Sequence, residues 1–363
     1  MANKPVPTVS SSPSIDPRIA AQNTYSQFRQ TERAKRLFLL DTIGQARNSK
    51  VIGYVTASRN NLGAGIGIDV IRVLRDHLSV IGKVDKIDLF LITRGGYALA
   101  PLRLISLLRE FAVKVGVVVP YMAHSAGTLI CLGGDEIVMG AMGELGPVDP
   151  SVSNHFNPVQ SGDDFPSGKM PTPRPRLPIS VEDVTSYLQL AIDKAKLDAT
   201  GMNVAFSALT KEIHPLALGN IMRQHTLIRH LVRRLLLMHM DEDGEKAKVD
   251  AIVETLTEKL YAHDYLITRN EAEKMGLKLS KPTDVLESAM WDLYKLYEEF
   301  LTINQEINLP AALGQQNQKY LCLDSALVES AGMCHAYSYK GMLGKKGSEI
   351  EMNLEFQGWE QYA

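Results

Sequence analysis

The chain has 363 residues, of which 45% are hydrophobic and 22% are charged, and its formal net charge is −2 at pH 7. These proportions are typical of a globular protein with a large apolar core. A net charge so close to zero creates no overall field that would draw the protein to nucleic acid or to anionic lipid. The three cysteines, Cys131, Cys322 and Cys334, have neither metal-binding nor disulfide spacing. We therefore expect a reducing, cytoplasmic setting and no metal site.

No segment of the sequence predicts secretion or a membrane span. Residues 1–23 lack the apolar stretch of a signal peptide, and their Ser and Pro content predicts a flexible tail. The longest apolar runs, such as VGVVVPYMA at 115–123, are too short to cross a bilayer. The phosphate-binding pattern GxxxxGK followed by Ser or Thr is also missing from the sequence, so any ATPase partner would be a separate chain.

Strand-like and helical patterns alternate in the first part of the chain. A helical pattern covers residues 24–48, and three apolar runs typical of buried strands follow it: VIGYVTA from Val51, IDLFLIT from Ile87 and VKVGVVVP from Val113. Amphipathic helical patterns, at 67–82 and 99–112, separate these runs. This alternation predicts right-handed crossovers and an α/β fold with a mostly parallel sheet.

The second part of the chain has a different character. Residues 147–178 are rich in Pro, Ser, Gly and Asn and predict a long irregular loop. Residues 179–300 are mainly helical in pattern, with Ser180 as the expected N-cap of the first helix. Residues 301–363 predict a β-hairpin around Ala331–Gly332, followed by a polar tail. We thus expect three parts: a tail over 1–23, a main domain over 24–300 and a C-terminal extension over 301–363.

Two glycine clusters follow the first two predicted strands. The first, LGAGIGID at 62–69, has the spacing GxGxG rather than the GxGxxG of a dinucleotide site, so it predicts a flexible turn over the sheet. The second, TRGGYAL at 93–99, stands directly at the carboxyl end of a strand. Gly95 and Gly96 leave the backbone bare there, so that an amide can point at a ligand, although a simple tight turn has the same sequence.

Ser125 stands in the equivalent position after the third strand, in the stretch PYMAHSAGT. Its small neighbours Ala123, Ala126 and Gly127 allow the sharp strand-to-helix turn of a nucleophile elbow, although Ala replaces the first Gly of the GxSxG pattern. A serine here can also serve only as a helix cap. In a parallel sheet, however, neighbouring strands end at the same edge, which would place Ser125 beside the amides of Gly96 and Ala126. That geometry suits the oxyanion of a tetrahedral intermediate.

These stretches resemble the serine dehydrogenase proteinase family, which is grouped with the Clp-protease and crotonase superfamily and is related to signal peptide peptidase A. The resemblance is carried by LFLITRGGYALAPLRLISLLREF at 89–111, VVVPYMAHSAGTLICLGGDEIVMGAMGELGPVDPSV at 117–152 and LPISVEDVTSYL at 177–188. The segment 261–277 is also similar to a helical element of the superfamily that ends in EAxxxGL.

The resemblance implies a Clp/crotonase-like ββα superhelix as the core of the main domain, with a homo-oligomeric assembly. It implies that Ser125 is the nucleophile and that the Gly96 and Ala126 amides form the oxyanion hole. Four further residues of the two glycine clusters would then lie at the substrate: Gly63, Gly65, Gly95 and Tyr97. Despite the family name, no pyridoxal or nicotinamide site is evident in the sequence, and we expect no cofactor.

Ser125 needs a general base, because a serine hydroxyl reacts only when another group removes its proton. The Clp proteolytic subunit has a histidine after the serine helix, whereas Asp149 stands in the matching turn here. Signal peptide peptidase A uses a lysine beyond that turn, and Lys169 falls in the comparable loop. A lysine base must be neutral, so its pKa has to be lowered by burial.

Three histidines are alternatives to Lys169 as the base. His155 lies in the same loop and would need no large pKa shift, and His263 lies in the helical element near the end of the resemblance. His124 adjoins Ser125 in the chain, but neighbouring side chains of an elbow diverge.

The sequence therefore predicts a soluble serine peptidase that hydrolyses peptide bonds through an acyl-enzyme on Ser125. A hydratase or hydrolase of acyl-CoA is an alternative on the same fold, because paired amides also hold a thioester oxygen. A second alternative is a non-catalytic scaffold, in which the helical region 180–300 and the terminal hairpin mediate assembly.

Overall fold

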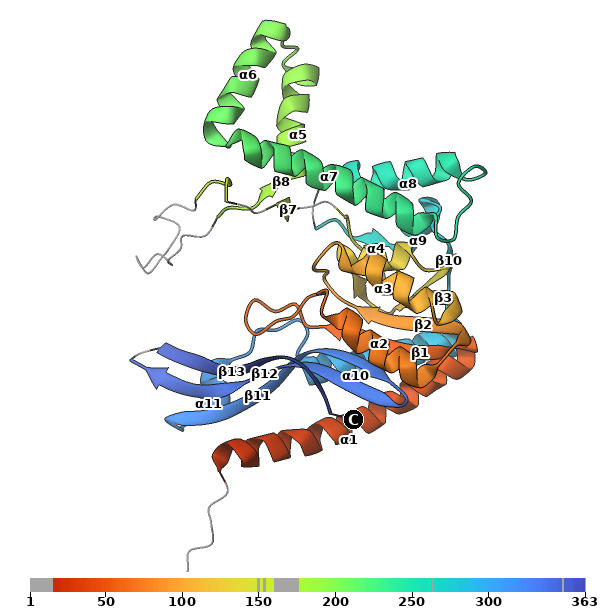
Figure 1. Ribbon diagram of the computed structural model, residues 1–363, viewed down its shortest axis with the longest axis vertical. Helices are drawn as coiled ribbons and strands as arrows, with labels where there is room; N and C mark the ends of the chain where they lie inside the picture. Colours follow the sequence, from red (N-terminus) through yellow and green to blue (C-terminus); the bar gives the residue numbers. More distant parts are fainter. Residues whose placement is uncertain are drawn as a thin grey trace, which may run out of the picture.

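The computed structural model describes residues 16–148, 151–152, 155–159, 176–260, 262, 264–347 and 349–362. Its helices and strands follow one another along the chain as labelled in Figure 1. The helices are α1 (Pro17–Arg47), α2 (Val70–Ile81), α3 (Ala100–Arg109), α4 (Ala126–Leu132), α5 (Val181–Gln189), which continues as a π-helix (Leu190–Lys194), α6 (Ala199–Glu212), α7 (Pro215–Leu236), α8 (Lys246–Glu258), α9 (Arg269–Lys274), α10 (Asp284–Leu301) and α11 (Leu309–Leu313). The strands are β1 (Lys50–Thr56), β2 (Val84–Ile92), β3 (Ala112–Val119), β4 (Met122–Ala123), β5 (Glu136–Met139), β6 (Glu144–Leu145), β7 (Ser151–Val152), β8 (Ile179–Ser180), β9 (Ile267–Thr268), β10 (Leu279–Ser280), β11 (Gln318–Ser330), β12 (Met333–Lys346) and β13 (Glu349–Gln361).

Among the described residues, the largest sheet has eight strands in the order β10-β5-β3-β2-β1-β11-β12-β13. The strands from β10 to β1 are all parallel, and β11 then adds to β1 in the antiparallel sense. The α/β class with a mostly parallel sheet is therefore confirmed. Because β1, β2 and β3 are neighbours and run in the same direction, the segments that follow them meet at one edge of the sheet.

Both faces of the parallel strands are covered, as expected for crossovers by helices. One face packs against α2, α3 and α4 through residues such as Ile52, Leu89 and Val117. The other packs against α1 and α10 through Val51, Phe90 and others that alternate with the first set along each strand. Figure 1 shows α1 and α10 on the side of the sheet opposite α2 and α3.

The C-terminal residues form more structure than we predicted. The hairpin at Ala331–Gly332 is present, but residues 349–361 form the strand β13 in place of a polar tail. Charged and apolar residues alternate along β13, so its high polarity conceals a period of two. Moreover, β11 pairs with β1, so the C-terminal strands extend the central sheet.

The first helix is also longer than predicted. It begins at Pro17, within the residues 1–23 that we expected to be a flexible tail. The physical reason lies in its first turn: Pro17 favours the first helical position, and the Asp16 carboxylate accepts a hydrogen bond from the Arg18 amide at 2.8 Å. The Ser and Pro content of this segment does not reveal this helix start.

The helical region differs in how firmly its parts are packed. Ser180 is the N-cap of α5 as predicted, its hydroxyl accepting from the amide of Glu182 at 3.0 Å. The helices α5 and α6 stand away from the sheet in Figure 1, and no side chain of α6 is buried. The helices α7 and α8 lie against the core, with Leu231, Val232 and Ile252 buried.

Two buried histidines link α2 to the C-terminal hairpin. The Nδ1 atom of His77 lies 2.7 Å from the Ser330 hydroxyl, and its Nε2 atom lies 3.1 Å from Nδ1 of His335. Burial lowers the pKa of His77 to about 3, and the charges of His335 and Arg33 act in the same direction. His335 has a lowered pKa for the same main reason. The pair is thus held in its neutral form.

We predict that this histidine pair makes the fold sensitive to acid. His77 has its ordinary pKa of about 6.5 in the unfolded chain, so the unfolded state binds more protons than the folded state below that pH. Its contribution to stability is complete above pH 6.5 and is lost as the pH falls toward 3, with a slope of up to about 1.4 kcal/mol per pH unit. In urea titrations, His77→Gln should be less stable at pH 7 but should lose stability more slowly on acidification. A slope equal to that of the wild type would refute this.

Candidate active site

Ser125 occupies a strained turn between β3 and α4. Its backbone has φ +50° and ψ −112°, a conformation that residues with a side chain rarely adopt. It stands at the N-cap position of α4, yet its side chain forms no capping hydrogen bond. The helix-cap interpretation of Ser125 is therefore wrong, and the hydroxyl is left half-buried at the edge of the sheet.

The small neighbours of Ser125 are explained by close packing against the end of β2. A β-carbon on Gly127 would lie 2.6 Å from Cγ2 of Thr93, which is too close for any larger residue. The segments that follow β2 and β3 are also joined directly: the Thr93 amide donates to the Met122 carbonyl at 3.0 Å, and the His124 amide donates to the Thr93 carbonyl at 3.0 Å. The turn that carries Ser125 is thus fixed to the turn that follows β2.

Gly95 and Gly96 bring that neighbouring turn against Ser125. Gly95 has φ +111° and Gly96 has φ +151°. A β-carbon on Gly95 would lie 2.8 Å from Cβ of Ser125 and 3.2 Å from the amide nitrogen of Ala126. Glycine is required here for both reasons, its backbone angle and its contact. The two turns do lie side by side, as the parallel sheet predicted.

A buried threonine hydroxyl supports this glycine turn. The Gly95 amide donates to Oγ1 of Thr93 at 3.0 Å, and the Thr56 hydroxyl at the end of β1 lies 2.8 Å from the same atom. Both threonines are buried. Sequence reasoning missed them, although each is a polar residue at the end of an otherwise apolar strand, and that is a usable signal.

The amides of Gly96 and Ala126 make no hydrogen bond to any described part of the chain. Gly96 pairs with Ile66 through its two neighbours: the Ile66 amide donates to the Gly95 carbonyl at 2.8 Å, and the Tyr97 amide donates to the Ile66 carbonyl at 2.7 Å. Because successive backbone amides point to opposite sides, the Gly96 N–H faces away from Ile66, on the side of β3 and Ser125. Two donors without a partner among the described residues and a hydroxyl therefore lie in one region.

The remaining residues that we expected at the substrate lie around this turn. A β-carbon on Gly65 would lie 2.9 Å from the Gly95 carbonyl oxygen, so the first glycine cluster packs directly on the second. The Gly63 carbonyl accepts a hydrogen bond from the Tyr339 hydroxyl at 2.7 Å. Tyr97 is 52% exposed and is accessible to a ligand.

Only some of the candidate bases lie among the described residues. Lys169, His263 and Asp149 lie outside the described residues. His155 is described and is exposed. The Nε2 atom of His124 lies 3.1 Å from Oε1 of Glu144, and burial raises the pKa of that carboxyl group. His124 is thus directed at a carboxylate on β6.

Thr128 ties the segment after β6 to the serine helix. Its side chain is fully buried, and its Oγ1 lies 2.9 Å from the carbonyl oxygens of both Ala123 and Gly146. The Gly146 amide donates to the same oxygen at 3.1 Å. The chain that leads toward Asp149 therefore starts from a fixed point beside Ser125. We did not single out Thr128 in the sequence.

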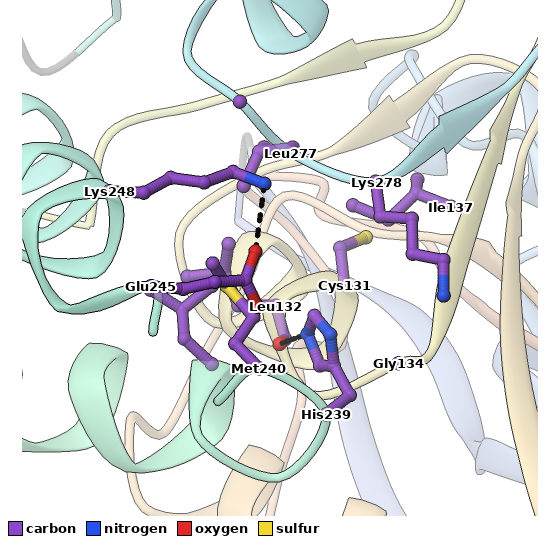
Figure 2. A pocket seen from close by; sticks show the side chains of 12 residues that line it. Cys131, Leu132, Gly134, Ile137, His239, Met240, Glu245, Lys248, Leu277 and Lys278 are labelled. Carbon is purple, nitrogen blue, oxygen red and sulfur yellow. Dashed lines mark hydrogen bonds and ion pairs between the residues drawn. The ribbon is translucent and has the colours of Figure 1, made fainter. Parts of the chain in front are cut away.

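A cavity of about 280 Å³ lies at the C-terminal end of α4, whereas Ser125 stands at the N-terminal end of this helix. Figure 2 shows the side chains that line the cavity. Its lining combines apolar side chains with His239, Glu245 and Lys248, the last two forming an ion pair at 3.3 Å. The Nε2 atom of His239 lies 3.0 Å from the carbonyl oxygen of Leu132, the last residue of α4. It therefore binds one of the carbonyls that a helix leaves unpaired at its end. The cavity is separate from the candidate active site.

The described residues contain neither a cluster of metal-binding side chains nor a membrane-spanning helix. In the part of the chain that the structure describes, no three His, Cys, Asp or Glu side chains are grouped as metal ligands would be. None of the helices described has both the length and the apolar composition needed to cross a membrane.

The first part of the chain matches one family model, and two proteins are similar to most of its length. Residues 21–161 match the family described as ClpP-like SDH-type serine proteinase, which confirms the resemblance seen in the sequence. Two uncharacterized proteins of Methanocaldococcus jannaschii are similar in sequence. One is 29% identical over 280 residues, covering 75% of this chain and 82% of the relative. The other is 25% identical over 271 residues, covering 73% of this chain and 77% of the relative.

Solved structures show only a distant likeness to this chain. A membrane-bound stomatin-specific protease in complex with a substrate peptide aligns with a TM-score of 0.36 at 16% identity, covering 62% of this chain and 74% of that protein. ClpP1 from Listeria monocytogenes aligns with a TM-score of 0.32 at 13% identity, covering 68% of this chain and 97% of that protein.

We predict that replacing Ser125 with glycine stabilises the protein relative to Ser125→Ala. Both changes remove the hydroxyl, but only glycine adopts the observed backbone angles without strain. The relief of strain exceeds the entropy lost by a more flexible unfolded chain, so we expect a net gain of about 1 kcal/mol. Urea unfolding of the two variants side by side measures the difference. Equal stability would mean that the turn is not strained in solution.

Proposed function

We propose, on the premise that residues 21–161 match the ClpP-like SDH-type serine proteinases, that this protein is a serine peptidase with Ser125 as its nucleophile. The observation that carries the proposal is the arrangement at the edge of the sheet. A hydroxyl that does not cap its helix lies on a strained turn, and the turn at Gly95 packs directly against it.

The chemistry follows from these groups. The Ser125 oxygen attacks the carbonyl carbon of a peptide bond, and its proton passes to a base. The carbonyl oxygen becomes an anion, which the amides of Gly96 and Ala126 bind by hydrogen bonds. Loss of one such donor typically costs about 3 kcal/mol of barrier, so the glycine turn is part of the catalytic centre in this proposal. The amine leaves with a proton from the base, and water then hydrolyses the acyl-enzyme.

The substrate would lie along the two glycine clusters, with Gly63, Gly65, Gly95 and Tyr97 at its sides. The bare backbone at the clusters suits an extended peptide, because main-chain groups can pair without hindrance from side chains. A peptide or protein substrate, a homo-oligomer and a cytoplasmic location belong to the same proposal.

We propose Lys169 as the base, with His155 and His263 as alternatives. His124 is disfavoured because neighbouring side chains of an elbow diverge; its Nε2 atom lies 3.1 Å from Oε1 of Glu144. An acyl-CoA hydratase or hydrolase would also use the paired amides but would give no role to a strained serine. A non-catalytic scaffold would explain the exposed helix α6 but not the two amides at the turn that lack a partner in the described part of the chain.

We predict that the wild-type protein reacts with a fluorophosphonate probe and hydrolyses peptides, and that Ser125→Ala does neither. The variant should fold normally, since it removes one oxygen that makes no capping bond. Labelling followed by peptide mapping, with circular dichroism as the control for folding, measures both properties. Equal labelling of the two proteins would exclude Ser125 as the nucleophile, and tightly bound CoA in the purified protein would favour the acyl-CoA alternative.

We further predict that Lys169→Ala reduces peptide hydrolysis by at least about 100-fold, the usual contribution of a general base. A lysine base acts only when neutral, so the wild-type rate should rise with pH until it passes the lowered pKa of that lysine. His155→Ala is the matched control, because it removes a candidate from the same loop. If Lys169→Ala is fully active while His155→Ala is not, the base is the histidine.

A further inference from the structure

The loop that carries the first glycine cluster is held in an unusual backbone path. It joins β1 to α2 and contains Leu62 at φ +48°. A β-carbon on Gly63 would lie 2.3 Å from the carbonyl oxygen of Arg59, so the loop folds tightly back on itself. A path this strained persists only when its surroundings fix it.

The surroundings that fix this loop come from the C-terminal strands. The Tyr339 hydroxyl on β12 donates to the Gly63 carbonyl at 2.7 Å. The Ser325 hydroxyl on β11 donates to the Leu62 carbonyl at 2.6 Å. These residues follow the loop by more than 260 positions in the sequence, so the contacts depend on the pairing of β11 with β1.

Arg59 forms the centre of this arrangement. Its side chain is buried, and its guanidinium donates to the carbonyls of Leu62 and Leu301 and to the Ser325 hydroxyl. It also reaches the Asp324 carbonyl at 3.2 Å. All of these acceptors are neutral, and burial lowers the pKa of Arg59 to about 10. A buried cation with several carbonyl partners joins the loop, the end of α10 and β11 at one point.

The loop in turn forms one side of the glycine turn. The Ala64 amide donates to the Ala57 carbonyl at 2.8 Å, which closes the loop. Ile66 then pairs with the residues on both sides of Gly96. A β-carbon on Gly96 would lie 2.3 Å from the Ile66 carbonyl oxygen, so no space separates the two segments. Movement of the loop would therefore change the direction of the Gly96 amide.

We propose that the C-terminal strands β11 and β12 position the oxyanion hole, through hydrogen bonds that Tyr339 and Ser325 donate to the loop that supports Gly96 and that Arg59 of this loop donates to β11. The proposal rests on the proposed function, because it assigns a catalytic consequence to this loop. It makes these three side chains positioning residues that do not touch the substrate. The C-terminal strands are then a functional part of the enzyme and not an accessory extension.

The sharpest test compares Tyr339→Phe with Tyr337→Phe. Both tyrosines lie on β12, and the Gln357 side chain donates to both hydroxyls, at 3.2 and 3.0 Å respectively. Each variant loses one hydroxyl and one contact with Gln357, but only Tyr339 reaches the loop at Gly63. Any loss of global stability that the two variants share therefore cancels when they are compared with each other.

Two readouts are needed, one of which does not depend on activity. Amide hydrogen exchange at Ile66 and Tyr97 reports whether the loop still pairs with the glycine turn. Turnover of a peptide substrate and the rate of fluorophosphonate labelling report the oxyanion hole. We expect Tyr339→Phe to exchange faster at both amides and to lose kcat by about 3–10-fold with KM unchanged, which is the value of one hydrogen bond of about 1 kcal/mol. Tyr337→Phe should match the wild type in both respects.

The outcomes separate this proposal from the proposed function. Equal exchange in the two variants would show that β12 does not hold the loop, and the inference would fail while Ser125 could still react. Faster exchange in Tyr339→Phe with turnover equal to that of Tyr337→Phe would also refute it, because the loop would then not control the oxyanion hole. If the wild type neither labels nor cleaves peptides, the proposed function fails, and the catalytic part of this inference fails with it.

Discussion

Two arginines of α1 are buried against carboxylates of β11, and much of the structure depends on these pairs. Arg29 binds Asp324, and Arg36 binds Glu329, with all four side chains almost completely shielded from water. Buried charges are costly to desolvate, and removal of one partner typically costs about 3–5 kcal/mol. The pairs therefore fix β11 against α1 in one register. In that register β11 lies beside β1, and Ser325 lies beneath the loop that approaches the glycine turn.

The candidate active site is built mainly from backbone groups rather than from a cluster of charged side chains. Its special features are the positive φ angle of Ser125, the glycine turn beside it and two amides without partners in the described chain. Such a site requires support from outside, because a strained turn and an unpaired amide are both unfavourable by themselves. Thr93 supplies that support from the sheet, and the loop at Ile66 supplies it from the side.

Local patterns in the sequence predicted the structural features that depend on residues close together in the chain. The order of strands and helices, the parallel sheet and the meeting of the Ser125 and Gly95 turns all follow from periodicity and from the rule for crossovers. The pairing of β11 with β1 does not follow from such patterns, because the two strands are far apart in the sequence and no local signal specifies their pairing. The hydrogen bonds from Tyr339 and Arg59 depend on that pairing, so the sequence could not predict them either. The strand β13 was missed for a different reason, since its many charged residues masked the alternation.

The hydrogen bond between Tyr339 and Gly63 joins residues 276 positions apart, and this separation has a consequence for biosynthesis. A ribosome adds about 5–20 residues per second, so β1, β2 and β3 emerge tens of seconds before β12. During that interval the nascent chain contains the serine turn but not the strands that hold the neighbouring loop. Contacts of such long range also form slowly in folding. If those strands position the oxyanion hole, a nascent chain that has already released β1 to β3 lacks that support until β11 and β12 have been synthesised and have folded.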